Sequence, residues 1–166
     1  MRIGTDALIT IRQLIREDRE PLHTILLETN VFTEAEIGIA LELIDTTLNN
    51  NHQNDYIVYT GVAERNEVVG YFCIGPTPAT VGTYDLYWIA VKPSYHGKGV
   101  GKELLHYIEN LVKTWGGRLL VAETSSQPKY DSTHMFYKKT KFIEAARIKD
   151  YYKVGDDLVV YAKYLS

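Results

Sequence analysis

Three glycines alternate with other residues at the start of a predicted helix, in the segment "HGKGVGKELL" at residues 96–105. The first N–H groups of a helix have no acceptor within the helix and carry partial positive charge, so a helix start attracts anions such as phosphate. Glycines at this position let a ligand approach the backbone closely, because they have no side chain and tolerate left-handed conformations. These glycines are Gly97, Gly99 and Gly101.

The same segment is basic within a chain whose formal net charge is -3, since the stretch from Lys92 to Lys102 has three lysines and no acidic residue. It therefore predicts a site for a small anion. The spacing excludes a P-loop, because His96 stands where that motif has its first glycine and Glu103 follows Lys102. A dinucleotide fingerprint also fails, since the third glycine comes one residue early. A tight strand-to-helix turn without a ligand is the alternative interpretation.

The composition of the chain limits its expected binding partners and its expected cellular location. Its 166 residues, 45% of them hydrophobic, predict one globular domain over residues 1–166. The acidic balance disfavours nucleic acid and anionic membranes as partners. A single cysteine, Cys73, excludes an intrachain disulfide and a cysteine-based metal site, so no metal is expected. The absence of a signal-like or membrane-spanning apolar run predicts a cytoplasmic protein.

Hydrophobic periodicity and turn residues predict the elements that position the glycine segment. Strands are expected at about 7–12, 56–63, 67–75, 83–91, 118–123, 142–150 and 157–165, and helices at about 16–30, 33–50, 101–115 and 132–140. Thr33 and Glu36 form a predicted capping box. The order β-α-α-β-β-β-α-β-α-β-β indicates an α/β (α+β) fold with a mixed, mostly antiparallel sheet of about seven strands and about four flanking helices.

Two motifs carry a resemblance to a known family. "HGKGVG" resembles the Arg/Gln-x-x-Gly-x-Gly/Ala loop of the GNAT N-acetyltransferases, within a longer match over "DLYWIAVKPSYHGKGVGKELL", and "MFYKKTKF" resembles the family's "lYeklGF" helix end. Three residues depart from the pattern: His96 replaces Arg or Gln, Lys141 replaces the glycine before Phe142, and Tyr130 replaces an asparagine that contacts pantetheine. The resemblance implies a GNAT-like domain that binds acetyl-CoA as cosubstrate.

The resemblance also implies which residues hold acetyl-CoA. Its pyrophosphate would lie on the loop made by His96, Gly97, Lys98, Gly99, Val100, Gly101 and Lys102. Backbone groups of Ile89, Ala90 and Val91 would pair with pantetheine like an added strand, and one N–H would polarise the thioester carbonyl.

Three side chains are candidates for catalysis. A lysine-like amine with a pKa of about 10.4 is almost fully protonated at neutral pH, so a base or a water relay would help it react. The resemblance places Asp85 where some members have a catalytic glutamate, and Glu123 at the end of the next strand is the second candidate. Both could instead recognise the cation, and Asp85 could be a solvated strand residue. Tyr137 matches the tyrosine that lies near the CoA sulfur and can protonate the thiolate.

Other polar residues have structural explanations. His23, His52, His106 and His134 lack metal-ligand spacing and are interpreted as surface or packing residues. Tyr84, Tyr87, Tyr130, Tyr151 and Tyr152 could line an acceptor groove, but core packing is favoured for most of them. "DYYKVGDD" could form an acceptor wall, although a hairpin turn on Gly155 and Asp156 is the favoured interpretation.

The leading hypothesis is an N-acetyltransferase that moves the acetyl group from acetyl-CoA to a primary amine, here a small molecule, by direct transfer in a ternary complex. The alternatives are a non-catalytic acyl-CoA-binding sensor and, disfavoured by the failed spacings, a nucleotide-binding protein. A homodimer is possible for such folds, and the sequence identifies neither the interface nor the acceptor.

Overall fold

The computed structural model describes residues 9–166. They form two compact units: an N-terminal unit of residues 9–75 and 88–110, and a C-terminal unit of residues 76–87 and 111–166. The strands are β1 (Thr10–Gln13), β2 (Ile57–Val62), β3 (Val68–Pro76), β4 (Thr83–Val91), β5 (Leu119–Ser125), β6 (Ile143–Lys153) and β7 (Asp156–Tyr164). The α-helices of the described residues are α1 (Arg19–Glu28), α2 (Glu34–Asn49), α3 (Val100–Thr114) and α4 (Asp131–Lys139).

The strands follow the order β1-β2-β3-β4-β5-β7-β6 in one seven-stranded sheet. Strands β4 and β5 are parallel, whereas β1–β2, β2–β3, β5–β7 and β6–β7 are antiparallel. The predicted element order and the mixed, mostly antiparallel sheet are therefore confirmed. The first strand, predicted at about residues 7–12, is observed at Thr10–Gln13, and residues 7 and 8 lie outside the described residues.

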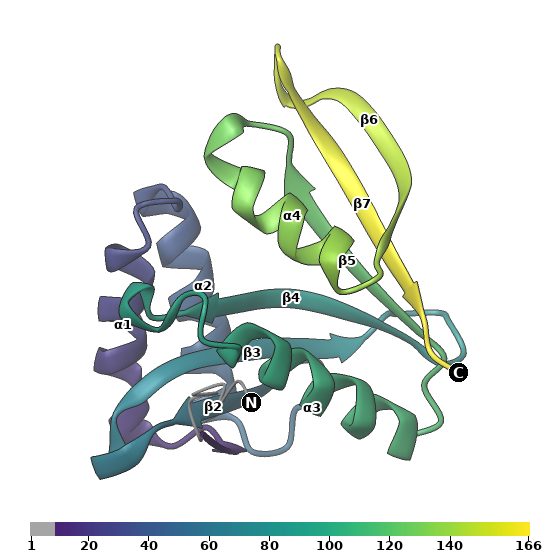
Figure 1. Cartoon of the computed structure of the whole chain (residues 1–166). Coiled ribbons are helices and arrows are strands. Elements are labelled where there is room, and N and C mark those ends of the chain that lie inside the picture. The colour runs from purple at the N-terminus through teal and green to yellow at the C-terminus, as the bar shows by residue number, and fades with distance from the viewer. Residues whose placement is uncertain (1–8) are drawn as a thin grey trace, which may run out of the picture. The chain divides into compact units, whose positions relative to one another are not determined.

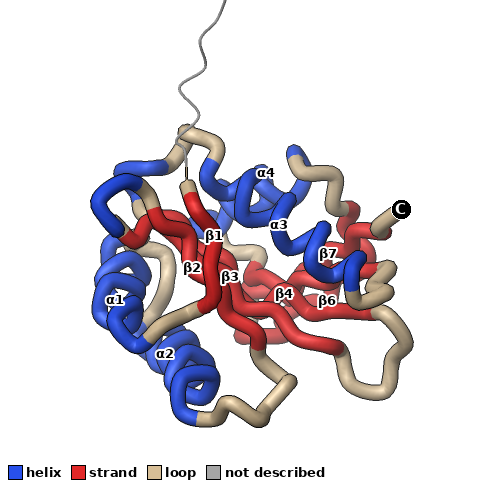
Figure 2. The backbone as a smooth tube through the Cα atoms, turned by 90° about the horizontal axis from the view of Figure 1, so that it is seen from below, coloured by secondary structure: helices blue, strands red, loops and turns tan. Residues whose placement is uncertain are grey.

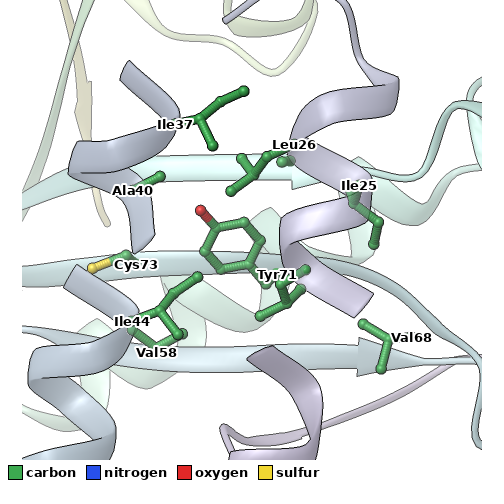
Figure 3. Packing of buried hydrophobic residues seen from close by; sticks show 11 residues of the cluster. Ile25, Leu26, Ile37, Ala40, Ile44, Val58, Val68, Tyr71 and Cys73 are labelled. Atoms are coloured by element: carbon green, nitrogen blue, oxygen red, sulfur yellow. The ribbon is translucent and has the colours of Figure 1, made fainter. Parts of the chain in front are cut away.

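In the N-terminal unit, helices cover both faces of the sheet. On one face, α1 and α2 bury Tyr71 and Cys73 of β3 (Figures 2 and 3). On the other face, Leu104 of α3 packs against Gly61 and Gly70, where an added Cβ would come within 3.3 and 3.2 Å of its side chain. Cys73 is buried as predicted, and burial raises the pKa of its thiol to about 12.

The start of α2 has the predicted capping box. The Thr33 hydroxyl accepts a hydrogen bond from the Glu36 N–H at 3.2 Å, and the Glu36 carboxylate accepts one from the Thr33 N–H at 2.6 Å. Two of the amides at the helix start are thereby satisfied, which explains why α2 begins at Glu34.

The β2–β3 and β6–β7 hairpins turn at residues with left-handed backbone. The β2–β3 turn uses Arg65 and Asn66, each with φ 59°. The β6–β7 turn uses Gly155 at φ 84°, so a hairpin built on Gly155 is confirmed. The strands reach further into this turn than expected, because β6 continues to Lys153 and pairs there with Asp156.

In the C-terminal unit, α4 lies against β5 and β7, and β6 forms the edge of the sheet (Figure 1). Every residue of β6 is exposed. Tyr151 and Tyr152 are consequently exposed and do not pack in a core. Tyr87, at the end of this unit's β4 segment, is also exposed, so the core interpretation is wrong for these three residues. Tyr130 is buried, so the core interpretation holds for this residue. Tyr84 is half-buried and packs against the exposed Trp115, with ring centroids 5.7 Å apart, so it is not a core residue.

Helix α4 ends in a motif that normally needs glycine. Lys141 has φ 69°, and beyond it the Phe142 N–H donates to the Tyr137 carbonyl at 2.9 Å while the Phe142 and Tyr137 rings pack 5.0 Å apart. This is a Schellman cap with its hydrophobic contact. The same cap ends α3, where Gly116 has φ 77° and the Gly117 N–H donates to the Val112 carbonyl. Lys141, at the position where the resemblance leads us to expect glycine, therefore adopts the left-handed backbone that this cap needs.

We predict that Lys141→Gly stabilises the protein. A left-handed conformation costs a non-glycine residue about 1 to 2 kcal/mol, part of which is offset by glycine's greater freedom in the unfolded chain. The free energy of unfolding in urea should rise by about 0.5 to 1 kcal/mol. Lys138→Gly removes the same side chain from a helical position and should instead lower stability by about that amount. A fall in both variants would mean that the Lys141 side chain itself stabilises the cap.

Candidate functional site

The glycine loop joins the end of β4 to the start of α3. A short 3-10 turn at Pro93–Tyr95 comes first, and Gly97 and Gly99 then adopt left-handed backbone with φ of 73° and 85°. The first helical bond runs from the Glu103 N–H to the Gly99 carbonyl, so the amides of residues 100–102 precede the helical bonding pattern. An ideal Cβ placed on Gly97 would meet no heavy atom within 4 Å, which leaves this backbone open to a ligand.

Gly101 has a different place from the one expected. It is the second residue of α3 and is not among the glycines with left-handed φ. Glycine is therefore needed for backbone freedom at Gly97 and Gly99, whereas at Gly101 only the missing side chain can matter for a ligand at the helix start. The other predicted loop residues lie in the same segment, between Gly97 and the first turn of α3. Of these, Lys98 and Lys102 are exposed and Val100 is buried.

Glu67, which the sequence analysis did not identify, anchors the loop. One carboxylate oxygen accepts a hydrogen bond from Lys92 at 2.7 Å, and the other accepts one from the Tyr95 hydroxyl at 2.6 Å. The hydrogen bonds from Lys92 and then Tyr95 hold the pKa of Glu67 below its usual range. The Lys92 ammonium group therefore forms an ion pair with Glu67, and the exposed cations of the loop are Lys98 and Lys102. Twenty-five residues separate Glu67 from Lys92, and no local pattern reveals such a pair.

His96 turns back toward β4. Its Nε2 lies 2.8 Å from the Val91 carbonyl oxygen, which can only accept, so Nε2 carries the hydrogen in this contact. This hydrogen bond therefore attaches the loop to the end of β4, the strand segment that is predicted to hold pantetheine. In that segment Ala90 is buried, and Ile89 and Val91 are half-buried. The Ala90 carbonyl oxygen would lie 2.9 Å from a Cβ on Gly70, so a glycine is needed at position 70.

Asp85 and Glu123 lie on one face of the C-terminal unit's sheet. The parallel ladder runs from Thr83–Leu119 to Asp85–Val121 and, in the described residues of this unit, goes no further. Paired residues share a face and side chains alternate along a strand, so Asp85, Val121 and Glu123 point the same way. Asp85 is half-buried and Glu123 is exposed. Asp85 is thus paired with Val121, and Glu123 lies two residues further along β5 on the same face.

Tyr137 lies on the opposite face of this unit's sheet. Its ring packs against Tyr161 of β7, with centroids 5.2 Å apart, and Tyr161 pairs with Ala122, the residue between Val121 and Glu123. Tyr137 is 5% exposed. Burial and the neighbouring Tyr161 raise the pKa of Tyr137 well above that of an ordinary phenol, so it remains protonated at physiological pH. Because side chains alternate along β5, the Tyr137 phenol lies on one face of this unit's sheet and the carboxylates of Asp85 and Glu123 lie on the other.

The four histidines outside the glycine loop, His23, His52, His106 and His134, have no common site. His134 is hydrogen-bonded to Tyr161 and Ser125, and His106 lies beside Asn110 on the surface of α3. Among residues 9–166, no group of three or more His, Cys, Asp or Glu side chains is arranged to hold a metal ion. No helix in this described part of the chain has the length and apolar character needed to cross a membrane.

Comparison with known proteins agrees with this geometry. The family model described as "Acetyltransferase (GNAT) family" matches residues 11–142. Among curated proteins, no sequence matches the chain significantly. A solved structure from Desulfovibrio desulfuricans, assigned to the GNAT family of acetyltransferases, is 38% identical, with a TM-score of 0.89 over 96% of this chain and 100% of that one.

Two more distant structures share the fold. The ribosomal-protein-S18-alanine N-acetyltransferase from Escherichia coli is 20% identical, with a TM-score of 0.72 over 96% of this chain and 95% of that one. An aminoglycoside 6'-N-acetyltransferase complexed with coenzyme A is 15% identical, with a TM-score of 0.72 over 95% of this chain and 97% of that one.

Proposed function

The chain belongs to the acetyltransferase (GNAT) family, whose model matches residues 11–142, and we propose that it transfers the acetyl group of acetyl-CoA directly to the primary amine of a small molecule. The observation that carries this proposal is the loop before α3. Left-handed Gly97 and Gly99 precede the amides of residues 100–102, and Lys98 and Lys102 add positive charge. This arrangement suits a pyrophosphate. The neighbour complexed with coenzyme A supports the same ligand class.

In this proposal the two faces of the C-terminal unit's sheet have separate tasks. Transfer breaks the carbon–sulfur bond and forms a carbon–nitrogen bond, while the amine loses a proton and the thiolate gains one. Glu123 accepts the amine proton, directly or through water, because it lies one pleat step beyond the last β4–β5 pair and is exposed. Asp85 adds negative charge that favours a cationic amine. Tyr137, on the other face, donates a hydrogen bond to the sulfur.

The raised pKa of Tyr137 defines how it acts. Even an ordinary phenol, with a pKa of about 10, is a weaker acid than a thiol with a pKa of about 8.5. Because burial moves the pKa of Tyr137 further up, complete proton transfer to the thiolate becomes less favourable. Hydrogen-bond donation that stabilises the developing thiolate is therefore the proposed role, and water supplies the proton afterwards.

The identity of the acceptor is tested by incubating the protein with acetyl-CoA and pooled amines and measuring the release of free CoA. The pools are aminoglycosides, polyamines and amino acids, and the contrasting class is peptides with a free N-terminus or a lysine. A thiol reagent can report the release, because the buried Cys73 thiol, with its raised pKa, reacts poorly in the folded protein. Faster release with a small amine supports the proposal. Release with peptides alone would replace the small-molecule acceptor by a protein.

Gly97→Ala should weaken acetyl-CoA binding by about tenfold or more, because its Cβ would occupy the surface where a phosphate approaches. Gly155→Ala is a matched control, since both glycines have left-handed φ and open space around an added Cβ, and Gly155 lies in the β6–β7 turn. Calorimetric titration with acetyl-CoA measures both variants. Equal affinity of Gly97→Ala and the unmodified protein would remove the loop from the binding site.

Glu123→Gln and Asp85→Asn should separate proton transfer from charge recognition. With an accepted amine, Glu123→Gln should lower kcat by about 100-fold near neutral pH and recover as the assay pH approaches the amine's own pKa. Asp85→Asn should mainly raise the KM for the amine. The reverse pattern would make Asp85 the base.

Tyr137→Phe keeps the ring and removes the hydroxyl. We expect kcat to fall by about 10- to 100-fold, while the Kd of acetyl-CoA changes by less than about threefold. Steady-state kinetics and calorimetry give the two values. Unchanged turnover would show that the hydroxyl does not assist the leaving thiolate.

A further inference from the structure

We propose that His134 is a positioning residue for Tyr137 and acts through the hydroxyl of Tyr161. This inference rests on the proposed role of Tyr137 in acetyl transfer. His134 and Tyr137 are three residues apart on α4 and both contact Tyr161 of β7, so they share the helix face that meets the sheet.

His134 joins the helix to two strands. Its Nδ1 lies 2.6 Å from the Tyr161 hydroxyl, and its Nε2 lies 2.9 Å from the Ser125 carbonyl oxygen at the end of β5. Both ring nitrogens are therefore used. A side chain tied at two points on neighbouring strands fixes the rotation of α4 about its axis more tightly than apolar contacts alone.

The partners determine the tautomer of the neutral ring. A carbonyl oxygen only accepts hydrogen bonds, so Nε2 must carry the hydrogen. Nδ1 then has a lone pair and accepts from the Tyr161 hydroxyl. The Tyr161 hydrogen is directed at His134, and the aromatic ring of Tyr161 is held in one orientation by its buried hydroxyl.

Tyr161 passes this orientation to Tyr137. The Tyr137 ring lies between Tyr161 and Phe142, at centroid distances of 5.2 and 5.0 Å. Phe142 belongs to the cap that ends α4, whereas Tyr161 belongs to β7 of the sheet. The Tyr161 ring is thus the fixed wall against which Tyr137 is placed. A hydroxyl that must meet a developing thiolate within hydrogen-bond distance depends on such placement.

Nuclear magnetic resonance tests the geometry without any acceptor. In protein with ¹⁵N-labelled histidine, His134 should show the Nε2–H tautomer, and Tyr161→Phe should shift its Nδ1 signal. With ¹³C-labelled tyrosine, the Tyr137 ring signal should shift or broaden in His134→Ala and in Tyr161→Phe. It should not change in His106→Ala, which removes an exposed helix histidine. The opposite tautomer, or an unchanged Tyr137 signal in both variants, would overturn the proposal.

Kinetics with the fastest amine of the panel tests the consequence. His134→Ala and Tyr161→Phe should each lower kcat by about tenfold and leave the KM for acetyl-CoA within about twofold. The double variant should be no slower than His134→Ala, because both changes break one link. Tyr161→Phe removes a single oxygen and keeps the packing, so normal turnover in that variant overturns the proposal even if His134→Ala unfolds. If no amine is acetylated, the proposed function fails, and the resonance experiment still decides the link from His134 to Tyr137.

Discussion

The parallel pairing of β4 with β5 is the constraint on which the arrangement of candidate residues depends. Two parallel neighbours cannot be joined by a tight turn, so the chain between them needs a crossover, which α3 provides. The crossover has to start at the end of β4, so the start of α3 follows this strand after one short loop. The loop at residues 92–100 is where the chain reverses, and its left-handed glycines make that reversal possible. A helix start at the far end of the loop that follows β4 is thus a consequence of strand direction.

The limited length of that pairing has a chemical consequence. The ladder in the C-terminal unit covers Thr83–Asp85 and Leu119–Val121, so β5 continues past its last pair with β4. Glu123 lies on this continuation, and its other neighbour is Val160 of β7. Strand alternation puts Glu123 and Ala122 on opposite faces, and Tyr137 lies over the Ala122 face through Tyr161. The proposed proton acceptor, Glu123, and the proposed hydrogen-bond donor, Tyr137, are therefore on opposite faces of this unit's sheet, because Glu123 and Ala122 are consecutive residues of β5.

Features governed by local chemistry could be predicted from the sequence. The α2 capping box, the order of elements and the left-handed loop glycines follow from residue types at short spacing. Features governed by distant partners could not. Lys92 reads as a free cation of the basic loop, yet it pairs with Glu67, and His134 reads as a packing residue, yet it joins two strands. Gly101 belongs to the predicted glycine pattern, but the helix begins one residue before it. Such assignments need the tertiary register, which no short motif contains.

The departures from the family pattern indicate which property of each position the fold requires. Lys141 retains the left-handed backbone and the Schellman bonds, so the cap needs a conformation, and glycine is only its least costly residue. His96 uses Nε2 to bond the Val91 carbonyl, so this position holds the loop on β4. At Lys141 the fold therefore requires a backbone conformation, whereas at His96 it uses a side-chain bond to the end of β4. A change of residue type at these two positions is thus compatible with the same helix cap and the same attachment of the loop to β4.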